Sequence, residues 1–224
     1  MIDPAARFTG LAFCQHPRSG GMLVIVYANN FVKKGTQTRV VNIPTRPGTF
    51  VPPTFTTPVR PTPVITTPEI TLPPLTEPQQ KMMGRKESTN FEEQNRLRTF
   101  PRAVALTIRD QIKQFDSSGN VLLQEDGTRL STNEGAEAWY EAERVLNSQA
   151  KVSALKWNDY LALAAEDHCK DTGPKGTMSH RGTDGSTSSK RVERYGDWDG
   201  TVSENISYGS GDKFIVQLYI DDGV

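Results

Sequence analysis

The spacing of apolar residues between residues 101 and 146 predicts two helices. After Pro101, apolar residues recur every three or four positions, which predicts a helix over residues 101–114. The next helix is expected to begin at a capping box, in which Ser131 and Glu134 satisfy each other's backbone amides. The pattern carries this second helix to about Leu146.

A third helix is predicted to open after Trp157, with Asn158 or Asp159 as its N-cap. Gly173 stands where a C-terminal cap is expected. One face of this helix combines large and small apolar residues with a histidine: Leu161, Ala164, Ala165 and His168. The small alanines favour close packing of this face against a sheet.

Shorter apolar runs predict the remaining elements. Residues 116–120 are expected to form a turn before a short strand at Val121–Leu123, and Lys213–Ile220 is expected to be a helix or a strand. The longest apolar run, Met22–Ala28, is far shorter than the roughly 20 residues that a membrane-spanning helix needs, so no membrane span is expected. It follows Arg18 but lacks a good cleavage site, which favours a stray strand or a misassigned start over a signal peptide.

Proline and threonine divide the chain into pieces. Most of the 15 prolines lie in one segment, where they remove backbone donors and favour an extended spacer without a core. The resulting division is an uncharacterised head at 1–43, a Pro/Thr-rich linker at 44–80, an N-terminal extension of the folded domain at 81–130, and the domain itself at 131–224. The linker is typical of an O-glycosylated stalk, an unmodified spacer or, more weakly, a proline-recognition ligand.

Charge and cysteine content exclude some classes of protein. The chain has 26 basic and 26 acidic side chains, whereas a general nucleic-acid binder carries a basic surplus, so no nucleic-acid partner is expected. Cys14 and Cys169 lie in different pieces of this division and offer no framework of disulfides within a domain. The sequence contains no CxxC metal motif.

Three histidines are candidates for chemistry. His16 has no acidic neighbours in sequence, and His168 is favoured as a hydrogen-bonded core residue over a ligand. His180 lies in a glycine-rich loop, where backbone freedom lets an imidazole point into a cleft. The acids that could converge on it are Glu204, Asp221 and Asp222. Such a set binds a divalent metal or supplies a general base, although a solvated loop histidine is the commoner alternative.

Five motifs follow one another toward the C-terminus: Leu155–His168, His180–Ser186, Arg194–Gly196, Glu204–Gly209 and Ile220–Val224. In this order they resemble the conserved segments of the CAP superfamily, which groups the cysteine-rich secretory proteins, antigen 5 and the pathogenesis-related 1 proteins and is also called the SCP domain. The resemblance covers about residues 131–224 and is to the branch without disulfides. The head and the linker are not covered.

The resemblance implies an α+β fold, the CAP-type α-β-α sandwich, with a central cleft that holds zinc or another divalent cation in several members. Two histidines and two acids line this cleft in the family; His180 and Glu204 match the first of each, and Asp221 is the best candidate for the second acid. The second histidine belongs to a segment that would follow Val224. The resemblance therefore implies an incomplete cation site, a missing C-terminal part of the domain and helix faces without their sheet strands.

Binding is favoured over catalysis. The leading hypothesis is a secreted or surface-associated, and so extracellular, CAP protein whose cleft takes a divalent cation or a small lipid-like ligand, or which binds a protein partner. The rival is a metal-assisted hydrolase in which His180 holds the ion and Glu204 activates water. It lacks an obvious third ligand, and no serine or cysteine lies in a nucleophile elbow. A third reading is a fragment without activity.

Overall fold

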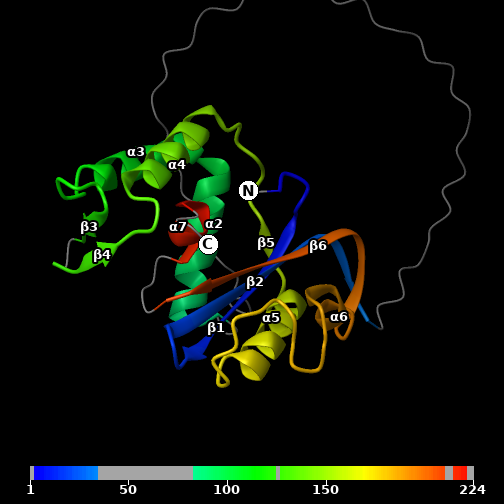
Figure 1. Cartoon of the computed structure of the whole chain (residues 1–224). Coiled ribbons are helices and arrows are strands. Elements are labelled where there is room, and N and C mark those ends of the chain that lie inside the picture. The colour runs from blue at the N-terminus through cyan, green and yellow to red at the C-terminus, as the bar shows by residue number, and fades with distance from the viewer. Residues whose placement is uncertain (1–2, 35–82, 125–126, 210–213, 221–224) are drawn as a thin grey trace, which may run out of the picture.

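The computed structural model describes residues 3–34, 83–124, 127–209 and 214–220. In chain order its elements are β1 (Phe8–His16), β2 (Gly20–Lys33), α2 (Arg85–Thr99), α3 (Pro101–Ile112), β3 (Val121–Leu123), β4 (Arg129–Ser131), α4 (Ala136–Ser148), β5 (Lys156–Trp157), α5 (Asp159–Thr172), α6 (Ser188–Val192), β6 (Gly196–Tyr208) and α7 (Phe214–Ile220). The main sheet has the order β5–β1–β2–β6, and β3 and β4 form a separate small hairpin (Figure 1).

The two central strands of the main sheet come from the N-terminal segment. β1 and β2 pair antiparallel from Phe8 opposite Ala28 to His16 opposite Gly20, and Gly20 has the positive φ of 82° that this tight connection requires. β1 then pairs in parallel with β5, and β2 pairs antiparallel with β6. Residues 8–33 of the segment treated above as a separate head thus form the middle of the sheet, and we call them the N-terminal hairpin.

Side chains of β2 alternate between two apolar layers. Met22, Val24 and Val26 pack with α5 and α6 on one face of the sheet, whereas Leu23 and Ile25 pack with α2, α3, α4 and α7 on the other. All five side chains are fully buried. Helices therefore cover both faces of the sheet, which confirms the expected α-β-α sandwich (Figure 1). The helix faces expected to lack sheet strands are covered by the N-terminal hairpin.

The contact between α5 and β1 is closest at Gly10. A Cβ atom built at Gly10 would lie 2.0 Å from the backbone nitrogen of Ala162, so the helix backbone rests directly on the strand. Ala164 and Ala165 on the same helix are fully buried, which explains why the sequence has small residues there. The expectation that this helix packs closely on a sheet is confirmed, although the strand it rests on belongs to the N-terminal hairpin.

All three predicted helices are present, but one of them begins at a different residue. α3 lies within the predicted 101–114, and the Asn158 side chain caps α5 by accepting hydrogen bonds from the amides of Tyr160 and Leu161. The capping box is wrong: Ser131 ends β4, and α4 begins one residue after Gly135, which makes no side-chain capping bond. Pairing of Ser131 with Val121 in the small hairpin takes the serine away from the helix.

Helix α2 was not predicted, because polar residues occupy much of its buried face. Asn95 accepts a hydrogen bond from the Leu155 amide at 2.7 Å and donates to the Leu155 carbonyl at 3.2 Å. Arg98, which is 1% exposed, donates to the carbonyls of Asp3, Ala6 and Ser153. These side chains tie α2 to the segments that lead into β1 and β5. A search for apolar periodicity assigns them to the surface.

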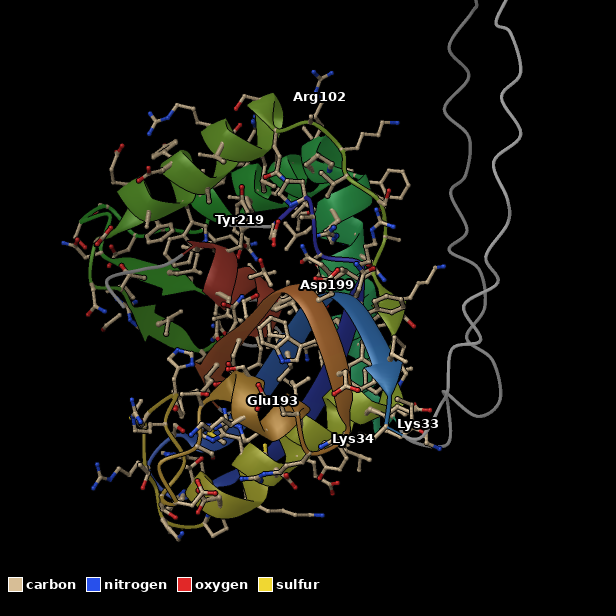
Figure 2. All side chains as sticks on the ribbon, turned by 90° about the vertical axis from the view of Figure 1, so that its right-hand side faces the viewer. Lys33, Lys34, Arg102, Glu193, Asp199 and Tyr219 are labelled. Atoms are coloured by element: carbon tan, nitrogen blue, oxygen red, sulfur yellow. The ribbon has the colours of Figure 1, made fainter. Side chains whose placement is uncertain are left out.

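The residue that follows β2, Lys34, is hydrogen-bonded to the segment after α6. The Lys34 amide donates to the carbonyl of Tyr195 at 3.1 Å, and its ammonium group donates to the carbonyl of Glu193 at 2.5 Å. Lys33, Lys34 and Glu193 gather at this edge of the molecule (Figure 2). In the part of the chain described here, no helix has the length and apolar character to cross a bilayer.

Candidate functional site

The structure brings His180 and Glu204 together. The Nδ1 atom of His180 lies 3.0 Å from Glu204 Oε1, and the second carboxylate oxygen accepts a hydrogen bond from Arg191 Nη2 at 2.6 Å. The His180 side chain is 66% exposed, whereas those of Glu204 and Arg191 are each 2% exposed. The predicted contact between His180 and Glu204 is therefore present. The buried partner of Glu204 is Arg191, however, and His180 contacts their ion pair from the surface.

Arg191 also holds the loop that carries His180. Its Nη1 atom donates to the carbonyl of Ser186 at 3.0 Å, and the guanidinium contacts the carbonyl of His180 at 3.3–3.4 Å. A cation approaching Glu204 would meet this positive charge and would have to displace it from the carboxylate. Among the residues placed by the structure, no three His, Cys, Asp or Glu side chains are grouped as a metal site needs. The third predicted cleft residue, Asp221, lies outside the described residues, as does Asp222.

The loop between α5 and α6 is held by further carboxylates. Asp171 accepts from the Lys175 ammonium group and from the Thr183 amide, each at 2.6 Å. These bonds, with that of Lys175 the largest effect, hold the pKa of Asp171 well below its usual range. Asp184 accepts from the amide of Ser186 at 2.8 Å, a bond that is typical of a turn started by an aspartate side chain. These bonds fix the backbone of the loop that carries His180.

His168 lies behind this loop in the core. It is fully buried on α5, and its Nε2 atom lies 2.8 Å from the carbonyl of Ser179, so the imidazole donates from Nε2. Burial, followed by the nearby positive charge of Arg191, lowers the pKa of His168 below its ordinary value of 6.5. The predicted core role for this histidine is confirmed.

The lowered pKa of His168 makes stability depend on pH. Below about pH 6.5 this histidine is protonated in the unfolded chain, whereas in the folded chain it stays neutral down to its lower pKa. Between the two pKa values the unfolded chain therefore binds more protons, and the free energy of unfolding falls as the pH drops. Each unit of pKa difference corresponds to about 1.4 kcal/mol. We expect His168→Gln to flatten the fall measured by urea unfolding between about pH 7 and about pH 5. The surface variant His180→Gln should retain it; equal slopes for wild type and His168→Gln would contradict this account.

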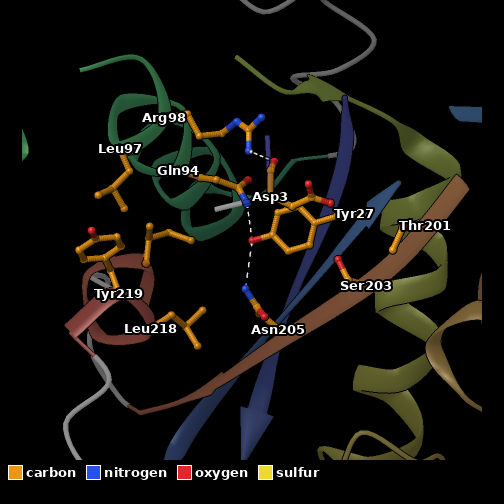
Figure 3. Close-up of a pocket in the computed structure, with 11 residues that line it drawn as sticks. Asp3, Tyr27, Gln94, Leu97, Arg98, Thr201, Ser203, Asn205, Leu218 and Tyr219 are labelled. Carbon is orange, nitrogen blue, oxygen red and sulfur yellow. Dashed lines mark hydrogen bonds between the residues drawn. The ribbon is translucent and has the colours of Figure 1, made fainter. Parts of the chain in front are cut away.

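A cavity of about 280 Å³ lies on the opposite face of the sheet from Glu204, between α2, α7 and the strands β2 and β6. Its apolar wall is formed by Leu97, Ile215, Leu218 and the ring of Tyr219. Its polar wall is formed by Tyr27, Gln94, Arg98 and Asn205, and the exposed side chains of Thr201 and Ser203 lie along its β6 side (Figure 3). We call this space the Tyr27 cavity.

The polar wall of the Tyr27 cavity centres on one hydroxyl group. Gln94 Nε2 donates to the Tyr27 oxygen at 2.5 Å, and Asn205 Nδ2 lies 3.4 Å from the same atom (Figure 3). Burial raises the pKa of Tyr27 to about 12, so the phenol is neutral. The carbonyl oxygen of the Gln94 side chain is buried and has no hydrogen-bond partner among the described residues. An amide in this state can bind a polar group that enters the cavity.

A second cavity, of about 380 Å³, lies on the other side of α7, between the β3–β4 hairpin and the end of β6. Trp139, Leu122 and Ile220 form its inner wall, and the exposed side chains of Leu130 and Met178 lie at its rim. Neither cavity is lined by His180 or Glu204. His180 and Glu204 therefore contact each other without lining either of these two cavities.

The sequence matches one known protein family. The sequence model of the cysteine-rich secretory protein family, CAP, matches residues 91–222, which is more than half of the chain. The chain belongs to the CAP family. No curated protein matches it, and no solved structure does.

The CAP match leaves out the N-terminal hairpin. The matched residues provide β5 and β6, the two outer strands of the main sheet, which do not pair with each other. β1 and β2 lie between them. In this CAP protein the sheet is therefore continuous only when residues 8–33 take their place in it.

Three residues of these sites were missed from the sequence. Arg191 lies beside the Arg194–Gly196 motif, but nothing in the pattern marks it as buried. Gln94 belongs to the helix that was not predicted. Tyr27 did leave a signal, since it is the one residue with a polar group inside the apolar run Met22–Ala28. Its position beside Asn205 follows from strand pairing that the sequence alone does not show.

Proposed function

We propose that this CAP protein is a binding module that takes a small lipid-like ligand in the Tyr27 cavity and performs no catalytic step on it. The observation that carries the proposal is the Tyr27 cavity, which has an apolar wall and is lined by Gln94, whose buried side-chain oxygen lacks a partner among the described residues. An unpaired buried polar atom costs about 1–3 kcal/mol, and a ligand that donates a hydrogen bond to it recovers part of that cost.

The two walls favour an amphiphile. The polar end of such a ligand would meet Gln94, Tyr27 and Asn205, while its apolar part would lie against Leu97 and Leu218. Small-molecule sites commonly combine a mainly apolar lining with a few polar groups that fix orientation. The exposed β6 side of the cavity gives the ligand a route from solvent.

The route of entry provides the test. We expect Ser203→Trp to fill the open side of the cavity and to weaken binding of a fluorescent fatty acid, cis-parinaric acid, at least about tenfold in Kd, because a bulky ring excludes the ligand without replacing a core residue. Asp197→Trp, at an exposed position of the same strand that does not line the cavity, is the matched control and should bind as wild type does. No binding by the wild type, or equal binding by the wild type and Ser203→Trp, would contradict the proposal.

A cation or hydrolase role at His180 and Glu204 is the weaker alternative. The guanidinium of Arg191 already neutralises Glu204, which favours a structural role for this carboxylate. Zinc titration of the whole chain, repeated with His180→Ala, tests the alternative directly. Tight uptake that is lost in the variant would restore a metal site, and weak uptake unchanged by the substitution would remove it.

Membership of the CAP family and the Pro/Thr-rich segment support a secreted or surface-associated protein in which residues 44–80 act as a spacer. The same location leaves room for a protein partner. Expression of the full-length gene with a C-terminal tag, followed by detection of the tag in medium and in cells, tests the location. Retention of all tagged protein inside intact cells would contradict it.

A further inference from the structure

The two cysteines meet in the folded protein. Cys14 lies on β1 and Cys169 on α5, 155 residues apart, and the Sγ atom of Cys14 lies 3.5 Å from the carbonyl oxygen of Cys169. The Sγ atom of Cys169 lies 3.5 Å from the carbonyl oxygen of Ala12, and both sulfur atoms lie 3.9 Å from the carbonyl oxygen of Met22. Their assignment to different pieces of the sequence therefore does not separate them in space.

The surroundings leave room for these two sulfur atoms and little else. Gly173 follows α5, and a Cβ atom at this position would lie 2.8 Å from the Cys14 sulfur and 2.6 Å from the Cys169 carbonyl oxygen. Cys169 is 1% exposed, whereas Cys14 is half-buried, and both are free thiols. Of the two cysteines, only Cys14 is partly exposed to solvent.

We propose that Cys14 and Cys169 form a reversible disulfide that fastens the N-terminal hairpin to α5, and that small disulfides of the glutathione class are the oxidant. The bond would join the segment outside the CAP match to the segment inside it. It would also close a loop that contains the whole Pro/Thr-rich segment. The two parts of the sheet would then stay together even when that segment is cut.

The chemistry of the pair gives the order of events. A hydrogen bond to the Cys169 side chain lowers the pKa of Cys14, and the same contact together with burial raises the pKa of Cys169. The Cys14 thiolate attacks one sulfur of the small disulfide, which forms a mixed disulfide and releases one small thiolate. Cys169 then gives up its proton and attacks the Cys14 sulfur, which releases the second small thiolate. Two protein thiols lose two electrons and two protons, and one small disulfide becomes two thiols.

The test uses the full chain with a site for a specific protease placed in the Pro/Thr-rich segment. The protein is equilibrated with oxidised glutathione, its remaining thiols are blocked, and the segment is cut before electrophoresis without and with reductant. We expect one band without reductant and two bands with it, and a loss of about 2 Da from the uncut chain, the mass of two hydrogen atoms. Cys14→Ser and Cys169→Ala are the matched controls, and each should give two bands in both lanes.

Every other outcome overturns the proposal. Two bands from the oxidised protein with both thiols still titratable would show that the sulfur atoms do not react. A stable glutathione adduct on Cys14 without the cross-link would show that Cys169 cannot reach it. A cross-link between two copies of the chain would assign the thiols to a different contact. Because the readout is taken on the cysteine-containing protein itself, misfolding of either variant leaves the test decisive.

Discussion

Replacing Arg191 with alanine is expected to lower the free energy of unfolding by about 3–5 kcal/mol, the range for removing one partner of a buried ion pair. The side chains of Arg191 and Glu204 are both 2% exposed, so the variant leaves a buried carboxylate without its compensating charge. It also removes hydrogen bonds to the carbonyls of Ser186 and His180. Urea unfolding at neutral pH measures the loss.

A nearby surface pair provides the control for Arg191. Arg194 forms ion pairs with Asp167 on α5 and with Asp184 in the following loop, but its side chain is 42% exposed, so Arg194→Ala should cost less than about 1 kcal/mol. The double variant Arg191→Met with Glu204→Leu removes both charges and should be more stable than Arg191→Ala alone. Equal losses for Arg191→Ala and Arg194→Ala would show that Glu204 is not buried as described, and would reopen its candidacy as a ligand.

Substituting Gly10 with valine is expected to destabilise the fold by more than about 3 kcal/mol, at or beyond the upper end of overpacking effects. The added Cβ would lie 2.0 Å from the Ala162 nitrogen and 2.4 Å from the Leu161 carbonyl carbon, so α5 has to move off the sheet. These contacts are to helix backbone, which cannot turn aside as a flexible side chain would. The melting temperature and the urea midpoint both report the effect.

Gly209 offers a matched control for Gly10. A Cβ there meets its nearest atom, on Gln217, at 3.6 Å, which is ordinary contact, so Gly209→Ala should change stability by no more than about 0.5 kcal/mol. A Gly10→Val protein with wild-type stability would mean that β1 does not lie against α5. In that case the N-terminal hairpin would be outside the domain, as the division of the sequence first indicated.

Local patterns predicted local structure. Periodicity and capping chemistry identified α3 and α5, and the motifs identified the contact between His180 and Glu204. α2 was missed because buried asparagine, glutamine and arginine side chains serve as clamps there, and periodicity counts only apolar residues. Pairing preferences between distant strands leave little trace in a single sequence.

The largest difference from the sequence prediction is the N-terminal hairpin, which also contributes Tyr27 to the cavity. A Pro/Thr-rich segment separates β2 from the rest of the domain, so the composition indicated a boundary where the fold has none. Tyr27 reaches the cavity, and Cys14 reaches Cys169, only because β1 and β2 enter the sheet. Both consequences depend on contacts that span more than 100 residues and so could not be read from local spacing.

Amide hydrogen exchange of the full chain, followed by mass spectrometry of its peptides, measures whether residues 8–33 form the middle of the CAP sheet. Peptides containing Leu23–Val26 should exchange as slowly as those from the middle of α5, because their amides open only when the whole domain unfolds. The same peptides from the chain unfolded in urea provide the fast reference. Exchange of Leu23–Val26 at the rate of that reference, with α5 still protected, would contradict the account.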